Sequence, residues 1–120
     1  MIEQLIARVF YARNVAHFEH WRANGTGSYA KHKALGEFYD GAIDALDTLV
    51  EVYQGAFELV GVIPAPDTKQ SDVLALLEAD AEWIETKHED LCQGNRAVAN
   101  LIDGLTGVYL SAIYKLRNLK

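Results

Sequence analysis

Hydrophobic residues recur every three or four positions along four stretches of the chain, the spacing that gives an α-helix one apolar face. The first stretch shows the pattern at Ile2, Leu5, Ile6, Val9, Phe10, Ala12 and Ala16. This periodicity predicts helices over about residues 2–23, 29–54, 72–92 and 96–118. No stretch shows sustained alternation of hydrophobic and polar residues, so the predicted fold class is all-α.

Glycine, proline and capping residues separate the predicted helices. Asn24-Gly25 favours a left-handed exit from the first helix, and Pro64 and Pro66 lie where no helix can pass them. The residues expected to cap the three later helices are Ser28, Ser71 and Asn95. The connections are therefore short, medium and short, which predicts one domain over residues 1–120, built as an antiparallel four-helix bundle.

Composition restricts the classes of function. The 120-residue chain has a formal net charge of −6, which argues against DNA binding because phosphates are bound through Lys and Arg. Cys92 is the only cysteine, so no intrachain disulfide can form and a reducing, cytoplasmic location is expected. Charges interrupt the N-terminal hydrophobic stretch, and we expect no segment that approaches the roughly 20 apolar residues of a membrane span.

Three of the four histidines, His17, His20 and His32, lie within sixteen residues on either side of the glycine turn. If the first two helices fold back on each other through this turn, His20 and His32 arrive at similar heights. Two facing imidazoles are a plausible start of a metal site. His17 lies one helical turn before His20, and we regard it as a secondary candidate whose alternative role is structural.

The second predicted helix supplies carboxylates. Asp47 and Glu51 are four residues apart, which puts them on one face, and Glu37 and Asp40 are secondary candidates. Mixed imidazole and carboxylate ligands suit Fe(II), Mn(II) or Zn(II). His32 and Asp47, however, lie about 22 Å apart along an intact helix.

One chain therefore cannot bring both groups to the same ion, whereas two copies packed antiparallel can. Each of two identical sites would take His20 and His32 from one chain and Asp47 and Glu51 from the other. The helices would cross near Asp40–Gly41, and the glycines at 36 and 41 could allow a close approach.

These residues resemble a known family. The segment His17-Phe18-Glu19-His20-Trp21, a short Gly turn, His32, and the acid pair of Asp47 and Glu51 resemble the Dps-like miniferritins of the ferritin-like superfamily. The spacings of the four candidate ligands agree with those of the family's ferroxidase ligands. The last predicted helix also resembles the family's final helix in its pattern of Leu and Gly.

The resemblance implies a ferritin-like bundle with dinuclear iron sites at a dimer interface. Such proteins oxidise Fe(II), typically with hydrogen peroxide, store the ferric product in a shell of twelve subunits, and in some cases coat DNA. Trp21 would lie near the reacting metal, and the protein would form at least a homodimer and possibly a dodecamer. Because imidazoles must be unprotonated to bind metal, iron binding should weaken below about pH 6.

The chain departs from the family pattern at three points. It does not show the family's usual basic N-terminal tail, so we do not expect it to coat DNA. Gly36 occupies the position one turn after His32, where the family often has an acid, and residues 61–70 leave no room for the extra short helix that family members carry across the dimer interface. A non-catalytic helical bundle that serves as an interaction scaffold is therefore the alternative function. Glu85 and His88 form a Glu-x-x-His step, which we interpret as surface or a minor site.

Overall fold

The computed structural model describes residues 1–66 and 72–120 and contains four helices. They are α1 (Ile2–Arg22), α2 (Ser28–Ala56), α3 (Val73–Cys92) and α4 (Arg96–Asn118). Each begins and ends within two residues of its predicted bounds. The predicted all-α, four-helix bundle is therefore confirmed.

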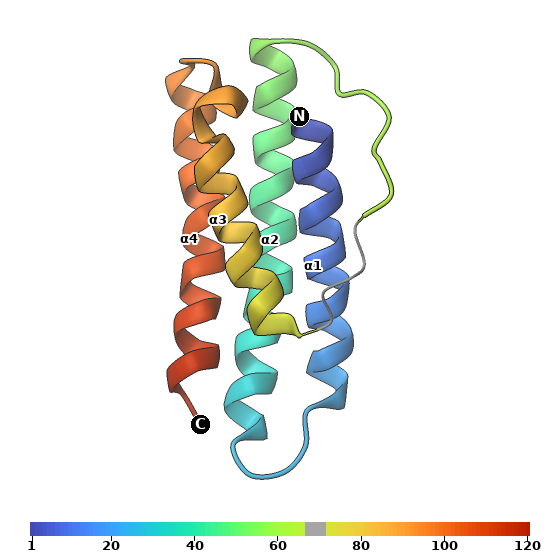
Figure 1. Cartoon of the computed structure of the whole chain (residues 1–120), viewed down its shortest axis with the longest axis vertical. Helices are drawn as coiled ribbons and strands as arrows, with labels where there is room; N and C mark the ends of the chain where they lie inside the picture. Colours follow the sequence, from blue (N-terminus) through green and yellow to red (C-terminus); the bar gives the residue numbers. More distant parts are fainter. Residues whose placement is uncertain (67–71) are drawn as a thin grey trace.

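The helices form two antiparallel hairpins, α1–α2 and α3–α4, joined by one long crossover (Figure 1). In going round the bundle, α1 packs on α2, α2 on α4, α4 on α3, and α3 on α1. Helices α2 and α3 begin at the same end of the bundle, so these two helices run in the same direction on opposite corners (Figure 1). Every packed pair of helices is consequently antiparallel.

One continuous hydrophobic core lies between the helices. Its largest fully buried side chains include Phe38 on α2 and Tyr109 on α4, whose rings meet edge to face with centroids 4.9 Å apart. Aromatic pairs of this geometry contribute about 0.5–1.5 kcal/mol beyond the area they bury. The periodic positions that predicted α1 supply its buried residues, which are Ile2, Leu5, Ile6, Ala7, Val9, Ala12 and Ala16.

The helix caps agree only in part with their prediction. Asn95 caps α4 as expected, since its side chain accepts a hydrogen bond from the Val98 amide at 3.0 Å. The prediction for Ser28 was wrong. Ser28 is the first helical residue, its side chain makes no cap, and Gly27 precedes it at φ 81°, because the turn folds through left-handed glycines. Ser71 lies outside the described residues, and the side chain that caps α3 is Asp72.

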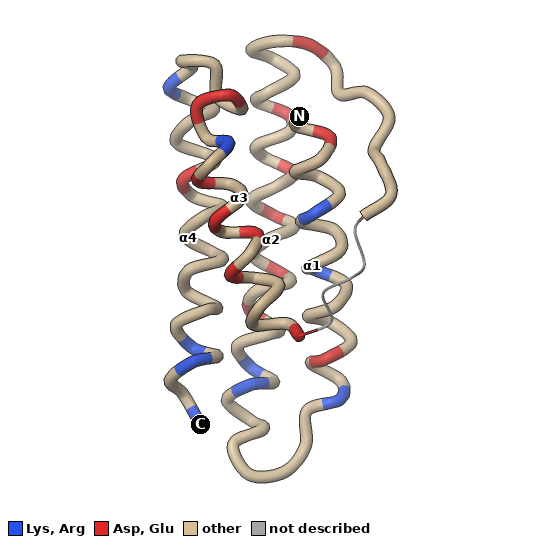
Figure 2. Tube along the Cα trace, in the orientation of Figure 1, with Lys and Arg blue, Asp and Glu red and all other residues tan. Residues whose placement is uncertain are grey.

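Charge is distributed unevenly along the bundle. Figure 2 shows basic residues near the α1–α2 turn and the C-terminus, and acidic residues over much of the opposite part. The same polarity holds within α2, where Lys31 and Lys33 lie near its start and Asp44, Asp47 and Glu51 lie in its later half.

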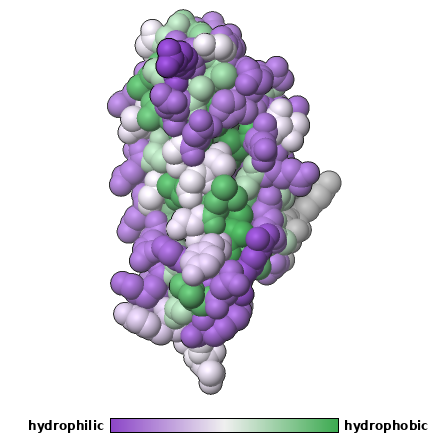
Figure 3. Space-filling view, turned by 90° about the vertical axis from the view of Figure 1, so that its left-hand side faces the viewer, coloured by the Kyte–Doolittle hydropathy of each residue, from purple (hydrophilic) through white to green (hydrophobic). Residues whose placement is uncertain are grey.

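Helix α4 is long and apolar enough to cross a membrane by length and composition alone, a segment that the hydrophobic pattern had not led us to expect. A core helix has the same properties, and six residues of α4 are buried, in a bundle where it packs against α2 and α3. Its outer surface includes the exposed Leu110 and Tyr114. On this side of the molecule, hydrophobic atoms gather in a band near the middle (Figure 3).

Candidate metal centre

The structure brings His20 and His32 together across the α1–α2 turn. Their rings stack with centroids 3.6 Å apart and an angle of 20° between planes. The Nδ1 of His20 lies 2.7 Å from the backbone carbonyl of His32, and the Nδ1 of His32 lies 3.0 Å from the carbonyl of His20. The two residues thus hold each other through a reciprocal pair of hydrogen bonds.

This pairing determines which ring nitrogens remain available. A carbonyl oxygen can only accept a hydrogen bond, so both Nδ1 atoms must carry the proton and donate. In the neutral rings, both Nε2 atoms then have free lone pairs, and the described residues offer no hydrogen bond to either one. Metal-binding histidines are commonly oriented in this way, with the second nitrogen donating to a carbonyl.

Gly36 lets the His20 ring lie against α2. A Cβ atom built at position 36 would come within 3.3 Å of the Cε1 of His20 and 3.4 Å of its Nδ1. The same crowding would affect an acid at this position, so the absence of the family's acid is consistent with the His20 conformation. Gly41 is also explained within the chain, because its Cβ would meet Val108 of α4 at 3.4 Å. Gly41 therefore faces α4, and our expectation that it allows a close crossing with a second copy was wrong.

Alanine substitutions should separate these packing roles. Gly104→Ala on α4, where an added Cβ meets nothing within 4 Å, should raise the free energy of unfolding by about 0.5–1 kcal/mol, the usual gain of helix propensity. Gly36→Ala should raise the free energy of unfolding by less than Gly104→Ala does, because the His20 ring must shift. The same shift should weaken metal binding. Urea denaturation and metal titration of both variants test this. A full gain at position 36 with unchanged metal affinity would contradict the role given to Gly36.

His17 and Trp21 pack beside the histidine pair. The His17 ring stacks on Tyr39 with centroids 4.2 Å apart. The centroid of the Trp21 ring lies 4.3 Å from that of His17. Trp21 is 67 % exposed. These contacts give His17 a packing role next to the site and leave Trp21 as a large, exposed aromatic surface.

The predicted carboxylates are separated from the histidines. Asp47 and Glu51 are both exposed and line an open groove of about 300 Å³ together with Phe10 and Ile63. Helix α2 is unbroken from Ser28 to Ala56, so within one chain Asp47 stays about 22 Å from His32.

The two secondary acids lie apart from the histidine pair. Glu37 faces α4, where its carboxylate pairs with Lys115, and this hydrogen bond lowers the pKa of the Glu37 carboxyl. Asp40 is exposed on α2. Among the described residues, neither acid forms a hydrogen bond or ion pair with His20 or His32, so one chain presents half of the proposed ligand set.

Sequence reasoning missed the polar group at the centre of the bundle. Asp80 on α3 is 1 % exposed; it accepts a hydrogen bond from the Tyr109 hydroxyl at 2.9 Å and pairs with Arg8 of α1 at 2.9 Å. Burial raises the pKa of Asp80. The helical spacing could have predicted this burial. Asp80 follows Val73, Leu76 and Leu77 at spacings of three or four residues and so falls on the buried face of α3.

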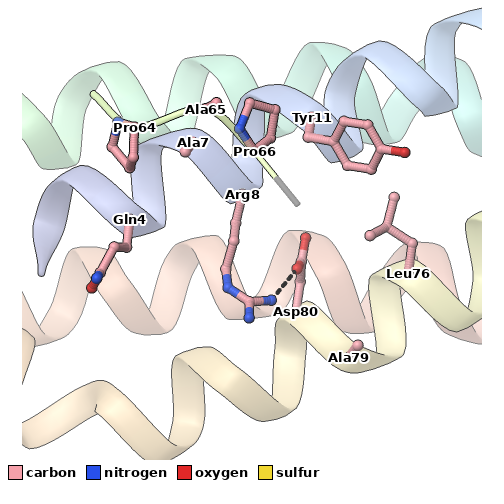
Figure 4. Close-up of a pocket in the computed structure, with 10 residues that line it drawn as sticks. All are labelled: Gln4, Ala7, Arg8, Tyr11, Pro64, Ala65, Pro66, Leu76, Ala79 and Asp80. Atoms are coloured by element: carbon pink, nitrogen blue, oxygen red, sulfur yellow. Dashed lines mark hydrogen bonds and ion pairs between the residues drawn. The ribbon is translucent and has the colours of Figure 1, made fainter. Parts of the chain in front are cut away.

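Arg8 and Asp80 also line a pocket of about 300 Å³ beneath the crossover, with Pro64 and Pro66 on its other side (Figure 4). The Arg8 guanidinium points to the Asp80 carboxylate, as the dashed line in Figure 4 marks. The Asp80 carboxylate and the Arg8 guanidinium are already paired with each other. We therefore assign the buried Asp80 a structural role in the core.

The Glu85–His88 step does not form a pair in the structure. The Nε2 of His88 lies 2.9 Å from the carboxylate of Asp103 on α4, whereas Glu85 is exposed. His88 therefore connects the two helices of the second hairpin.

A family model matches residues 20–116, most of the chain. The chain belongs to DUF5856, a family of unknown function. The DUF5856 match includes all four proposed ligands, His20, His32, Asp47 and Glu51, and excludes most of α1. No curated protein and no solved structure matches the chain. The resemblance to the Dps-like miniferritins consequently rests on the residues quoted for it.

Proposed function

We propose that this protein is a ferroxidase whose iron sites are shared between two copies of the chain. Each site takes the Nε2 atoms of His20 and His32 from one chain, and the partner's Asp47 and the partner's Glu51. The observation that carries this proposal is the reciprocal hydrogen bonding of His20 and His32, which orients both imidazoles and leaves both Nε2 lone pairs free.

The outer face of the α1–α2 hairpin supports self-association. Phe10, Phe18, Trp21 and Ile63 are large hydrophobic residues of α1 and the crossover that are at least 41 % exposed. Exposed apolar residues of this kind mark interaction surfaces when they lie together. The groove beside Asp47 and Glu51 includes Phe10 and Ile63, so acid ligands and apolar contact residues occur on the same surface.

Charge complementarity favours an antiparallel arrangement of the two copies. The start of α2 carries Lys31 and Lys33, and its later half carries the three acids Asp44, Asp47 and Glu51. Two copies related by a two-fold axis, with α2 crossing near Asp40, place Lys31 and Lys33 of each copy against the acidic later half of the other copy's α2. The same arrangement puts His32 opposite the midpoint between the partner's Asp47 and the partner's Glu51.

The topology is also consistent with this proposal. Two antiparallel helical hairpins joined by one long crossover are the arrangement of ferritin-like bundles, and residues 57–66 here run back along the bundle from the end of α2 (Figure 1). A larger assembly would need further contacts, for which the exposed Leu110 and Tyr114 of α4 offer a second apolar surface.

In the proposed reaction, Fe(II) is the substrate. Two ferrous ions each give one electron to a peroxide molecule, which takes up two protons and leaves as two waters. The chain provides ligands of mixed imidazole and carboxylate type, a geometry suited to Fe, Mn or Zn. His17 and Trp21 pack beside the histidines and would exclude water on that side of the site.

Anaerobic Fe(II) titration followed by peroxide tests the proposal. We expect ferric absorbance that saturates at a fixed iron count per dimer, and a dimeric or larger mass by light scattering. His32→Ala and Asp47→Ala should each abolish oxidation above buffer, while Asp90→Ala, an exposed acid on α3, should leave it unchanged. A strictly monomeric protein, or oxidation that survives His32→Ala, would refute the shared site.

A non-catalytic scaffold is the second candidate function. The observation in its favour is Gly36, because the His20 ring occupies the space where the acid common in the resembling family would begin. In this case the α1–α2 face would still associate, and Fe(II) oxidation would not exceed that of buffer.

A further inference from the structure

A second group of metal-binding side chains lies on the last turns of α3, at the far end of this helix from its Asp72 cap. Ligand atoms of His88, Glu89 and Cys92 all lie within 4.8 Å of one another. The Nδ1 of His88 is 3.7 Å from a carboxylate oxygen of Glu89. These residues belong to α3, not to the α1–α2 face used by the proposed iron site.

Helical spacing explains why the three side chains meet. His88 and Cys92 are four residues apart, and Glu89 and Cys92 are three apart, so Cys92 neighbours both on the helix surface. Cys92 is 2 % exposed, whereas the side chain of Glu89 is 89 % exposed. The group therefore lies at the boundary between core and solvent, with its most exposed ligand, Glu89, on the outside.

Asp103 of α4 orients the His88 ring independently of this spacing. Its carboxylate lies 2.9 Å from the Nε2 of His88. With the proton on Nε2 donated to Asp103, the Nδ1 of the neutral ring has a free lone pair on the side of Glu89 and Cys92. A carboxylate that holds the outer nitrogen of a histidine is the usual support of a metal-binding imidazole.

We propose that His88, Glu89 and Cys92 bind a zinc ion, with Asp103 as the residue that positions His88. One nitrogen, one carboxylate oxygen and one thiolate form a donor set suited to Zn(II), and water would complete a tetrahedral shell. On binding, the Cys92 thiol gives its proton to solvent and its sulfur bonds the metal. Rotation of the exposed Glu89 side chain can bring its carboxylate closer to His88 and Cys92.

Titration of the reduced full chain with Co(II), a spectroscopic probe for Zn(II), tests the site. In the His20→Ala background, where the proposed iron site is disabled, we expect one equivalent per chain. The complex should show a near-ultraviolet charge-transfer band that only a thiolate ligand produces, and this band should be lost when Zn(II) is added. Cys92→Ser should remove the band. Asp103→Asn should weaken Co(II) binding by about 10- to 100-fold, the usual effect of losing such a support.

Two variants provide controls. Glu85→Gln removes an exposed acid one turn before His88 and should leave the band and the affinity unchanged. His20→Ala should also leave the band intact, which separates this site from the proposed iron site. The proposal is overturned if the wild-type chain shows no charge-transfer band, or if the band survives Cys92→Ser. Circular dichroism confirms that each variant is helical.

Discussion

Two inactive variants, when mixed and allowed to exchange subunits, are expected to regain iron oxidation. One variant carries His20→Ala and His32→Ala, and the other carries Asp47→Ala and Glu51→Ala. Each homodimer has only defective sites, because every site lacks one kind of ligand. A heterodimer has one intact site, built from the histidines of the second variant and the carboxylates of the first, and one site that lacks all four ligands.

The size of this recovery follows from symmetry. If subunits exchange at random, half of the dimers are mixed and each has one working site of two, so oxidation should reach about a quarter of the wild-type rate. The measurement is the peroxide-dependent ferric absorbance of each variant alone and of the mixture after exchange. The exposed positions of Asp47 and Glu51 make their alanine variants well tolerated by the fold.

A mixture that remains at the rate of buffer, although mass spectrometry shows heterodimers, would contradict a site shared between chains. A matched control mixes the histidine variant with one that carries Asp90→Ala and intact ligands. In that mixture, homodimers of the Asp90→Ala variant should keep both active sites. Each heterodimer should keep one active site.

Asp80→Ala is expected to cost the fold about 2–4 kcal/mol of unfolding free energy. The Asp80 side chain is 1 % exposed and bonded to both Tyr109 and Arg8. Its removal leaves the fully buried Tyr109 hydroxyl without its partner, at about 1–3 kcal/mol, and the half-exposed Arg8 without its counter-charge. Because Arg8 can turn to solvent, the loss should fall below that for a fully buried pair.

Urea denaturation with Asp80→Asn as the matched variant separates charge from packing. The asparagine keeps a similar shape and can still accept from Tyr109, so it should cost less than Asp80→Ala. An alanine variant as stable as wild type would contradict a structural role for this group.

The pH dependence gives a second readout of the same residue. Burial raises the pKa of Asp80, so the folded chain holds this proton more tightly than the unfolded chain. Ionised Asp80 therefore costs stability at neutral pH, and that cost is relieved as pH falls through the raised folded-state pKa. Wild type should gain stability relative to Asp80→Asn on acidification from about pH 7 toward pH 4.

Local sequence features were sufficient to predict the four helices and the contact between His20 and His32. Helical periodicity depends on neighbours three or four residues away, and the Gly25–Gly27 turn joins the two helices that carry His20 and His32. The cap of α4 at Asn95 is local in the same sense, since its partner is only three residues away.

The direction of the crossover, the partners of Glu37 and Gly41, and the polar centre at Asp80 required the tertiary structure. Glu37 pairs with Lys115, and Asp80 pairs with Arg8; these partners are 78 and 72 residues apart. A sequence pattern shows that a helix has a buried face, but which other helix covers that face depends on the packing of the whole core. By itself the sequence determined four helices and a histidine pair; only the assembled bundle decided what each outer face of α2 contacts.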